Sequence, residues 1–476
     1  MNSSTDKKVP FALFLSMALP LLLLAIPTEA LPLTGMTVLG HRMLAIFLLA
    51  TLFWILEPVP VFATSVLIIF LELLLISDKA LPFLRPVNTE AISFTPISYK
   101  AVMAVFSSPI ILLFIGGFFL ANASKKYKLD QLLTRVCILP FGKKTSLVIF
   151  GVMSLTAVLS MFMSNTATTA MMLAIIMPLL KNFKDDDKGR VAMILAVPFA
   201  ANLGGLGTPI GTPPNAVALK YLIGENTISF GTWMLFGVPY VFVMLLFTWV
   251  LLLALFPINL KEVHLKLDSR TRLNKKALIV YVTFGLTVLL WVTDRIHGIN
   301  AYIVAMLPIV VFTLTGVMGA EDLKKISWDV LWLVAGGLAL GFGMEKTGLS
   351  KNIVDSIAFS EMPALLIISS ISFISVVMAT FMSNTATANL ILPIVFVLGS
   401  NTPALAETGG SKILILATTF ACSLAMSLPV STPPNAIAYA SGIIKSEYLI
   451  KAGLIIGMTG LTTLFGMLFI LNLLKF

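Results

Sequence analysis

The chain has 476 residues, of which 58% are hydrophobic and only 11% are charged. Soluble domains average about 25% charged residues, so this composition excludes an ordinary soluble domain. The many separate apolar runs have the length that crosses a bilayer as a helix, which predicts an all-α polytopic membrane protein. The net charge of +10 does not indicate nucleic-acid binding. The basic residues cluster in a few loops, as the positive-inside rule expects.

The first part of the chain, 1–123, is predicted to form scaffold spans, at 9–27, 42–57, 60–78 and 108–123. A basic segment, 124–144, follows, and the spacing of its apolar residues predicts an amphipathic helix at the membrane interface. Glu57 and Glu72 lie in the early spans. Ionisable residues at membrane depth are functional candidates. Because neither acid has a counterpart in the second half of the chain, we expect an interfacial or packing role for both.

The next part, 145–256, begins with an apolar stretch, 145–181, that is too long for one membrane crossing and short for two. Ser164-Asn165-Thr166 lies near its middle, so we expect a re-entrant hairpin with this sequence at the tip. Non-helical backbone at membrane depth is tolerated only where it lines a cavity or is buried in protein, which makes the tip a candidate site. The remaining elements are a helix broken at Thr212-Pro213-Pro214 and a clean span, at 191–223 and 232–256.

A polar, basic linker, 257–276, is expected to be cytoplasmic and divides the chain into two halves. Three further scaffold spans are predicted within 277–344. The last part, 345–476, is predicted to contain a second hairpin, a second broken helix and a final span. These elements are expected at 277–293, 301–317, 328–344, 363–398, 412–443 and 453–474.

Two strings of residues occur in both halves. Phe162 to Thr168 recurs letter for letter as Phe381 to Thr387, and Thr212 to Ala216 recurs as Thr432 to Ala436. The predicted total is eleven spans plus two hairpins, with five spans between the two tips. An odd number gives the two copies opposite orientations, which is the inverted-topology repeat of secondary transporters. The basic residues of the loops favour a cytoplasmic N-terminus and an external C-terminus.

The repeated breaks can bind ions of both signs. Ser, Asn and Thr are favoured N-cap residues, so the helix after each tip would offer free N–H groups and its positive dipole end to an anion. Thr212 and Thr432 would cap the helices that begin at Pro213 and Pro433. The helices that end at the breaks leave carbonyl oxygens unpaired, and these suit Na⁺. Because neither tip carries a charged side chain, co-bound Na⁺ would compensate an anion, and no organic cofactor is expected.

Two other classes of protein are weighed against this interpretation. A membrane-embedded enzyme would need a nucleophile–base pair or a metal cluster near the breaks. The breaks contain no His, Cys, Asp or Glu, so we expect no enzyme. A passive channel is the third class, and the duplicated hairpins favour an occluded site instead.

The paired motifs resemble those of the divalent anion/sodium symporters, the group that includes the INDY-type dicarboxylate transporters, over nearly the whole chain from about residue 40. The resemblance implies an elevator-type homodimer, in which a transport domain with both hairpins moves past a scaffold domain. It implies sodium-coupled symport of C4 dicarboxylates such as succinate, fumarate and malate across a bacterial inner membrane. Citrate or sulfate symport and sodium-independent dicarboxylate exchange stay open as alternatives.

The resemblance also implies which residues form the site. The substrate carboxylates would meet the tips and the second Pro-Pro, at Asn165, Thr166, Asn384, Thr385 and Pro433. The two Na⁺ sites would be formed by Ser160, Ser164, Asn165 and Gly211, and by Ala379, Ser383, Asn384 and Ser431. Ala379 stands where the first copy has Ser160 and offers only its carbonyl oxygen, so the two cation sites are expected to differ.

Overall fold

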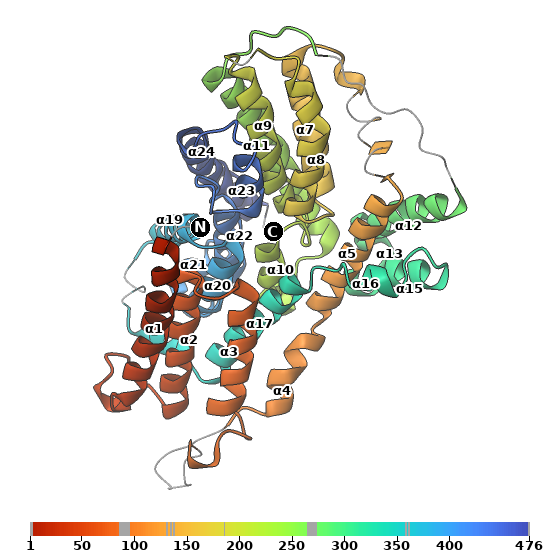
Figure 1. Ribbon diagram of the computed structural model, residues 1–476. Coiled ribbons are helices and arrows are strands. Elements are labelled where there is room, and N and C mark those ends of the chain that lie inside the picture. The colour runs from red at the N-terminus through yellow and green to blue at the C-terminus, as the bar shows by residue number, and fades with distance from the viewer. Residues whose placement is uncertain are drawn as a thin grey trace.

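The fold is all-helical in a computed structural model of the chain (Figure 1), apart from two isolated β-bridges among the described residues. The structure describes residues 3–84, 96–129, 132–133, 136, 139–184, 186–263, 274–357, 359 and 362–474. Helices α1, α2 and α3 stand together at the lower left of Figure 1, and α7, α8, α9 and α11 form the upper block.

The first helices follow the apolar runs closely. α2 and α3 are separated by the Pro58-Val59-Pro60 sequence, because proline lacks the N–H that a continuing helix needs. α5 begins at Pro109, with Ser108 as its N-cap, and runs on through Lys126. The bounds are α1 Ser3–Ala25, α2 Val38–Leu56, α3 Val61–Leu75, α4 Tyr99–Ala104 and α5 Pro109–Lys126. Within the predicted interfacial helix over 124–144, α5 extends to Lys126, a 3-10 turn spans Leu139–Phe141, and residues 130–131, 134–135 and 137–138 lie outside the described residues.

Both predicted hairpins are pairs of helices joined by a short tip. α7 and α8 meet at 161–164, and α19 and α20 meet at 382–383. Each pair is followed by a helix that is interrupted before its Pro-Pro sequence, and then by one long helix. The bounds are α7 Thr145–Ser160, α8 Asn165–Leu180, α9 Gly189–Gly204, α10 Pro213–Leu219, α11 Phe230–Leu255, α19 Ala364–Phe381, α20 Asn384–Asn401, α22 Gly410–Ser423, α23 Pro433–Tyr439 and α24 Ser446–Leu473.

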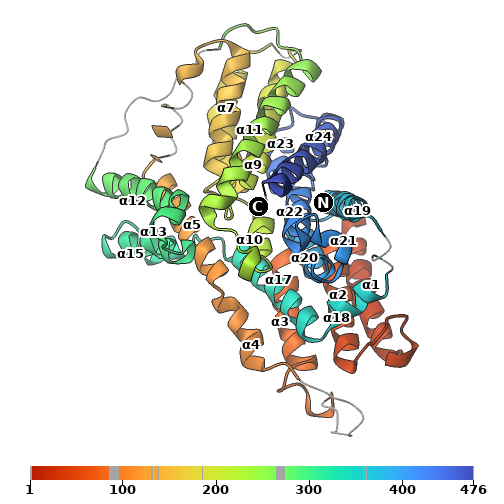
Figure 2. The ribbon, with the colours of Figure 1, turned by 180° about the vertical axis from the view of Figure 1, so that it is seen from behind.

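The middle of the chain forms a separate group of helices beside α5, at the right of Figure 1. α17 leaves this group and runs between α3 and the α10–α20 region, as both views show (Figure 2). Residues 264–273 of the predicted linker lie outside the described residues. The bounds are α12 Lys275–Val292, α13 Asp294–His297, α14 Ala301–Val304, α15 Met306–Leu314, α16 Ala320–Leu323, α17 Trp328–Lys346, α18 Leu349–Asp355 and α21 Pro403–Ala406.

Seven of the described helical segments are long and apolar enough to cross a membrane. They are Val38–Leu56, Tyr99–Lys126, Gly189–Gly207, Phe230–Leu255, Lys275–Val292, Ala364–Phe381 and Ser446–Leu473. Most of the other expected spans and hairpin arms are shorter apolar helices, such as α3, α7 and α8. α17 has the length of a span but carries Asp329, Glu345 and Lys346 near its ends.

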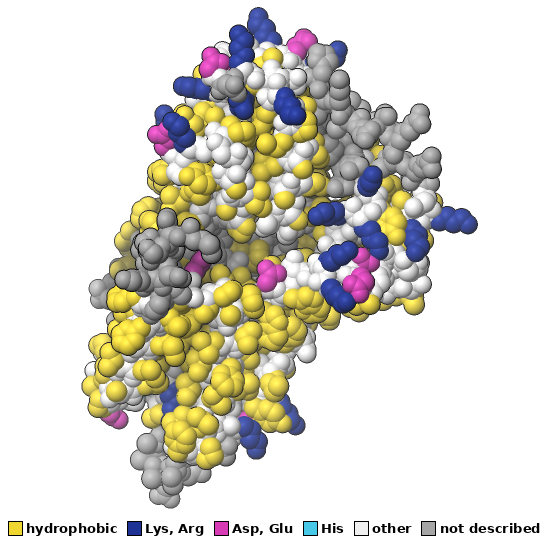
Figure 3. All heavy atoms as spheres, viewed as in Figure 1, with side chains coloured by type: hydrophobic (Ala, Val, Ile, Leu, Met, Phe, Trp, Pro, Cys, Tyr) yellow, Lys and Arg dark blue, Asp and Glu magenta, His cyan; other side chains and the backbone are white. Residues whose placement is uncertain are grey.

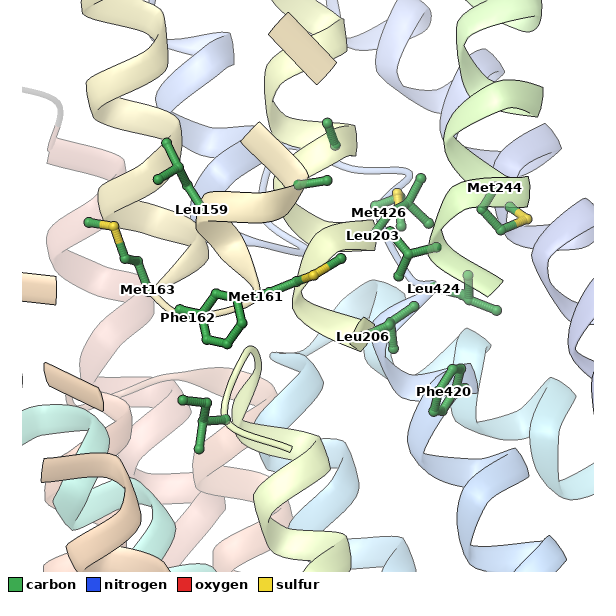
Figure 4. Close-up of a cluster of buried hydrophobic side chains, with 14 of the residues drawn as sticks. Leu159, Met161, Phe162, Met163, Leu203, Leu206, Met244, Phe420, Leu424 and Met426 are labelled. Carbon is green, nitrogen blue, oxygen red and sulfur yellow. The ribbon is translucent and has the colours of Figure 1, made fainter. Parts of the chain in front are cut away.

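A packed apolar core holds the first tip in place. Figure 4 shows Met161 and Phe162 of the tip close to Leu206, which follows α9. Trp233 of α11 closes the other side, because its indole N–H donates to the Leu206 carbonyl at 3.0 Å and its ring stacks on Phe420 at 5.9 Å between centroids. A fully buried tryptophan with a satisfied N–H fixes the backbone that it contacts.

Candidate functional site

One cavity of about 500 Å³ brings both tips and both Pro-Pro breaks together. Its polar wall comes from the two repeats, and its apolar wall from α3, α5 and α17. Figure 3 shows a hollow in the middle of the face seen there. The polar lining includes Ser164, Asn165, Thr166, Asn202, Gly211, Thr212, Asp329, Ser383, Asn384, Thr385, Ser431 and Thr432, and the apolar lining includes Phe62, Phe114, Phe118 and Leu333. Of the predicted site residues, only Ser160 and Ala379 do not line it.

Each tip ends in a serine that caps the next helix. The Ser164 hydroxyl accepts a hydrogen bond from the Ala167 N–H at 3.2 Å, and the Ser383 hydroxyl accepts one from the Ala386 N–H at 3.1 Å. A single cap satisfies only one of the N–H groups that a helix leaves free at its start. The first turns of α8 and α20 therefore keep donors and the positive end of the helix dipole for an anion in the cavity.

The first tip gathers oxygen atoms around the Asn165 amide. Asn165 Oδ1 lies 2.6 Å from Ser160 Oγ, and the Ala201 carbonyl oxygen lies 2.8 Å from the same hydroxyl. When the amide is rotated, its nitrogen lies 3.3 Å from the Ala201 carbonyl and 3.1 Å from the Gly211 carbonyl. One orientation therefore makes an all-oxygen cluster of the kind that a hard cation takes, and the other satisfies the same oxygens with N–H groups.

The second tip differs in its oxygen donors. Asn384 Oδ1 is buried and has no hydrogen-bond partner among the described residues. Ser431 Oγ donates to the Thr380 carbonyl at 2.8 Å, so the Thr380 carbonyl approaches this loop. The Thr380 hydroxyl is engaged within its own helix, where it donates to the Val376 carbonyl at 2.7 Å. Ala379 is buried and contributes no side-chain oxygen.

The asparagine of each Pro-Pro-Asn sequence fixes the shape of its break. Asn215 Nδ2 donates to the Gly205 carbonyl at 3.0 Å and the Thr208 carbonyl at 2.8 Å. Asn435 Nδ2 makes the matching bonds to Met426 at 2.8 Å and Leu428 at 3.0 Å. These amides satisfy carbonyls that the broken helices leave without a helical partner.

The two threonines that precede Pro-Pro behave differently. Thr432 caps α23, since its hydroxyl accepts a hydrogen bond from the Asn435 N–H at 3.3 Å. Thr212 makes no side-chain capping bond. The expected capping role is therefore confirmed for Thr432 and wrong for Thr212, although both helices begin with proline.

The citrate transporter family (CitMHS) matches residues 51–407. This chain belongs to that family. A Haemophilus influenzae protein named "Uncharacterized transporter" is 31% identical over 395 residues, which cover 77% of this chain and 82% of that protein. The Staphylococcus saprophyticus protein "Sodium-dependent dicarboxylate transporter SdcS" is 29% identical over 453 residues, which cover 87% and 82%.

Two solved structures share the fold. The YdaH transporter of Alcanivorax borkumensis matches with a TM-score of 0.53 at 12% identity, over 86% of this chain and 96% of that one. MtrF of Neisseria gonorrhoeae matches with a TM-score of 0.51 at 13% identity, over 86% and 94%. The predictions of an all-α polytopic membrane protein and of a transporter rather than an enzyme are confirmed.

Two polar residues of this CitMHS protein's cavity were missed by reasoning from the sequence. Asn202, near the end of α9, donates to Thr432 Oγ1 at 3.1 Å and Asn435 Oδ1 at 3.3 Å, and so joins the first repeat to the second. An asparagine inside an apolar helix was the available signal. Asp329 of α17 is the one charged side chain among the described lining residues. No motif surrounds it, because it enters the cavity from outside the repeats.

Proposed function

We propose that the protein is a sodium-coupled symporter of C4 dicarboxylates such as succinate, fumarate and malate, in a bacterial cytoplasmic membrane. The observation that carries the proposal is that both Ser-Asn-Thr tips meet in one cavity. Two separated tips suit two separated carboxylates. In this proposal Asn165 and Thr166 meet one carboxylate, and Asn384 and Thr385, with Pro433 close by, meet the other.

Sodium coupling is supported by the oxygen clusters behind the tips. Ser160, Asn165, Ala201 and Gly211 supply the first set of oxygens, and Ser164 orders the tip as its cap. Asn384, Ser431 and the Thr380 carbonyl supply the second, near Ser383 and Ala379. A divalent anion among neutral groups would need compensating charge, which bound Na⁺ supplies without a fixed cationic side chain. Staphylococcal relatives carry sodium dependence in their names.

We further propose that the chain works as a homodimer with an elevator-type movement. The hairpins, broken helices, α11 and α24 would form the transport domain, and α1–α5 with α12–α17 would form the scaffold domain. The repeats would have opposite orientation, with the N-terminus cytoplasmic and the C-terminus external. Figure 3 shows basic side chains gathered at the upper end of the molecule, which supports a cytoplasmic position for that end.

The test is uptake of radiolabelled succinate into proteoliposomes with and without an inward Na⁺ gradient. Uptake that requires Na⁺ and resists excess sulfate is the expected result. Uptake that ignores the Na⁺ gradient but requires internal dicarboxylate would make the protein an exchanger. If the vesicles accumulate sulfate but not succinate, the assignment of a dicarboxylate as the substrate is wrong.

Citrate is the second candidate substrate, because the matching family is described as a citrate transporter. The same vesicles decide between the two with labelled citrate and unlabelled succinate as competitors. If succinate is the substrate, excess citrate lowers succinate uptake weakly and labelled citrate does not accumulate. If labelled citrate accumulates and succinate competes with it only weakly, citrate is the substrate and the dicarboxylate assignment is wrong.

A further inference from the structure

Asp329 of α17 is the one charged side chain among the described residues that line the cavity. It is exposed, and it makes no ion pair with a described residue. A carboxylate accepts hydrogen bonds and cannot donate them. Its charge repels a dianion in the same cavity. The carboxylate is therefore favourable to binding only if the ligand also offers it a hydrogen-bond donor.

α17 packs in parallel against α20, the helix that begins at the second tip. A Cβ atom at Gly337 would collide with the Asn389 side chain of α20, and one at Gly341 would lie 3.3 Å from Pro393. A step of four residues along α17 thus matches a step of four residues along α20. Counted back in this register, the first turn of α20 is level with the α17 residues one turn before Gly337.

α3 packs on another face of α17, also in parallel. A Cβ atom at Gly336 would collide with Ser65 of α3, and one at Gly343 would lie 2.6 Å from Glu72 Oε1. A step of seven residues along α17 matches a step of seven residues along α3. The start of α3 at Val61 is therefore also level with the α17 residues one turn before Gly336.

Asp329 and Leu333 lie along the seam between the α20 face and the α3 face of α17. Leu333 is four residues before Gly337 and three before Gly336, and residues at these spacings are neighbours on a helix surface. Asp329 is one turn nearer the start of α17, and both side chains line the cavity. Because a helix rises about 1.5 Å per residue, Asp329 lies about 6 Å beyond Leu333 along the axis. It therefore stands in front of the starts of α20 and α3.

The second tip presents its donors at this end of α20. Asn384 and Thr385 form the first turn of the helix, and both line the cavity. The positive dipole ends of α20 and α3 favour negative charge in front of them, which offsets part of the repulsion between Asp329 and a bound anion. A substrate carboxylate that meets Asn384 and Thr385 therefore lies on the side of the cavity to which Asp329 belongs.

We infer that Asp329 determines specificity by accepting a hydrogen bond from a hydroxyl on the substrate carbon next to the carboxylate at the second tip. The inference rests on the proposed function and names the preferred class within it, which is the C4 dicarboxylates with a 2-hydroxyl group, such as malate. Charge-assisted hydrogen bonds are stronger than neutral ones. Malate and succinate meet the same repulsion from Asp329, but only malate gains the hydrogen bond. The ratio of their affinities therefore isolates the hydrogen bond.

The test measures how unlabelled malate and unlabelled succinate compete with radiolabelled succinate for Na⁺-driven uptake into proteoliposomes. Wild type should be half-inhibited by malate at a concentration at least fivefold lower than by succinate. In Asp329→Asn this preference should fall about threefold or more, while succinate inhibits at an equal or lower concentration because the repulsion is removed. Asp329→Ala should show almost equal inhibition by the two, and Asp329→Glu, which keeps the carboxylate, should prefer malate more than Asp329→Ala does.

The matched control is Glu447→Gln, at an exposed acid of α24, which should keep the wild-type preference. Uptake of labelled succinate by each variant verifies that it is folded. An equal change for both competitors in Asp329→Asn and Asp329→Ala, or a higher Na⁺ requirement with an unchanged preference, would overturn the inference. So would a wild-type protein that does not prefer malate. Wild-type protein that takes up neither succinate nor malate would instead overturn the proposed function.

Discussion

Asn165 and Asn384 are the first helical residues after the two tips, and both line the cavity. Asn165→Ala and Asn384→Ala should each lower succinate uptake by about 10- to 100-fold, because hydrogen bonds to charged groups contribute about 1.5–3 kcal/mol. Uptake into proteoliposomes is the measurement. Asn401→Ala, at the exposed end of the same helix as Asn384, is the control. Normal uptake by both tip variants would refute the site.

The cation sites should respond unequally to the loss of one hydroxyl. Ser160→Ala removes an oxygen that faces the Asn165 amide, whereas Thr380→Ala removes a hydroxyl engaged within its own helix. We expect the Na⁺ concentration for half-maximal uptake to rise about tenfold for Ser160→Ala and less than twofold for Thr380→Ala, since one favourable oxygen contact contributes about 1–2 kcal/mol. Equal shifts in the two Na⁺ titrations would contradict the difference between the sites.

The break after α9 depends on close backbone approach. A Cβ atom at Gly205 would lie 2.9 Å from Asn165 Oδ1 and 3.0 Å from the Gly211 carbonyl. Gly205→Ala should therefore displace the oxygens around Asn165 and weaken Na⁺-dependent uptake by about tenfold or more, within the usual cost of crowding a packed interior. Gly285→Ala, in open space on α12, should leave Na⁺-dependent uptake unchanged. Comparable uptake by both variants would show that the close approach is unimportant.

Asn215 and Asn435, whose amides hold the two Pro-Pro-Asn breaks, are fully buried and should matter for stability. Asn435→Ala leaves the Met426 carbonyl without the amide that pairs it, while the Leu428 carbonyl keeps only its hydrogen bond from the Ser431 N–H. Each unsatisfied buried group costs about 1–3 kcal/mol, so the midpoint of thermal unfolding in detergent should fall clearly below that of wild type. An unchanged midpoint would mean that water replaces the amide.

The helical hairpins and the breaks could be predicted because their sequences occur in both halves of the chain. Identical strings at corresponding positions identify a break that one apolar stretch alone would leave ambiguous. The partners of those breaks could not be predicted in the same way. Ala201 contributes only a backbone carbonyl, and Asp329 reaches the cavity from α17. Neither a carbonyl contact nor a long-range approach leaves a pattern in the sequence.

At the scale of the whole molecule, the proposed orientation can be tested with reporter fusions. Alkaline phosphatase joined after Phe476 should be active and green fluorescent protein at the same place should be dark, because phosphatase folds only outside the cytoplasmic membrane. Fusions after Lys188, in the basic connection between α8 and α9, should give the opposite result, as the positive-inside rule requires. The same reporter active at both points would exclude the proposed topology.

Asn202 has no equivalent in the second repeat. Counted back from Asn435, the corresponding position is Cys422, a buried thiol. The first repeat therefore donates hydrogen bonds from Asn202 to Thr432 and Asn435 of the second repeat, and Cys422 has no amide with which to make the reciprocal bonds. On the proposed function, a ligand with two different ends, such as malate, meets unlike surroundings at each end and should bind in one preferred pose. A single bound orientation of malate would therefore reflect the divergence of the two repeats at this position.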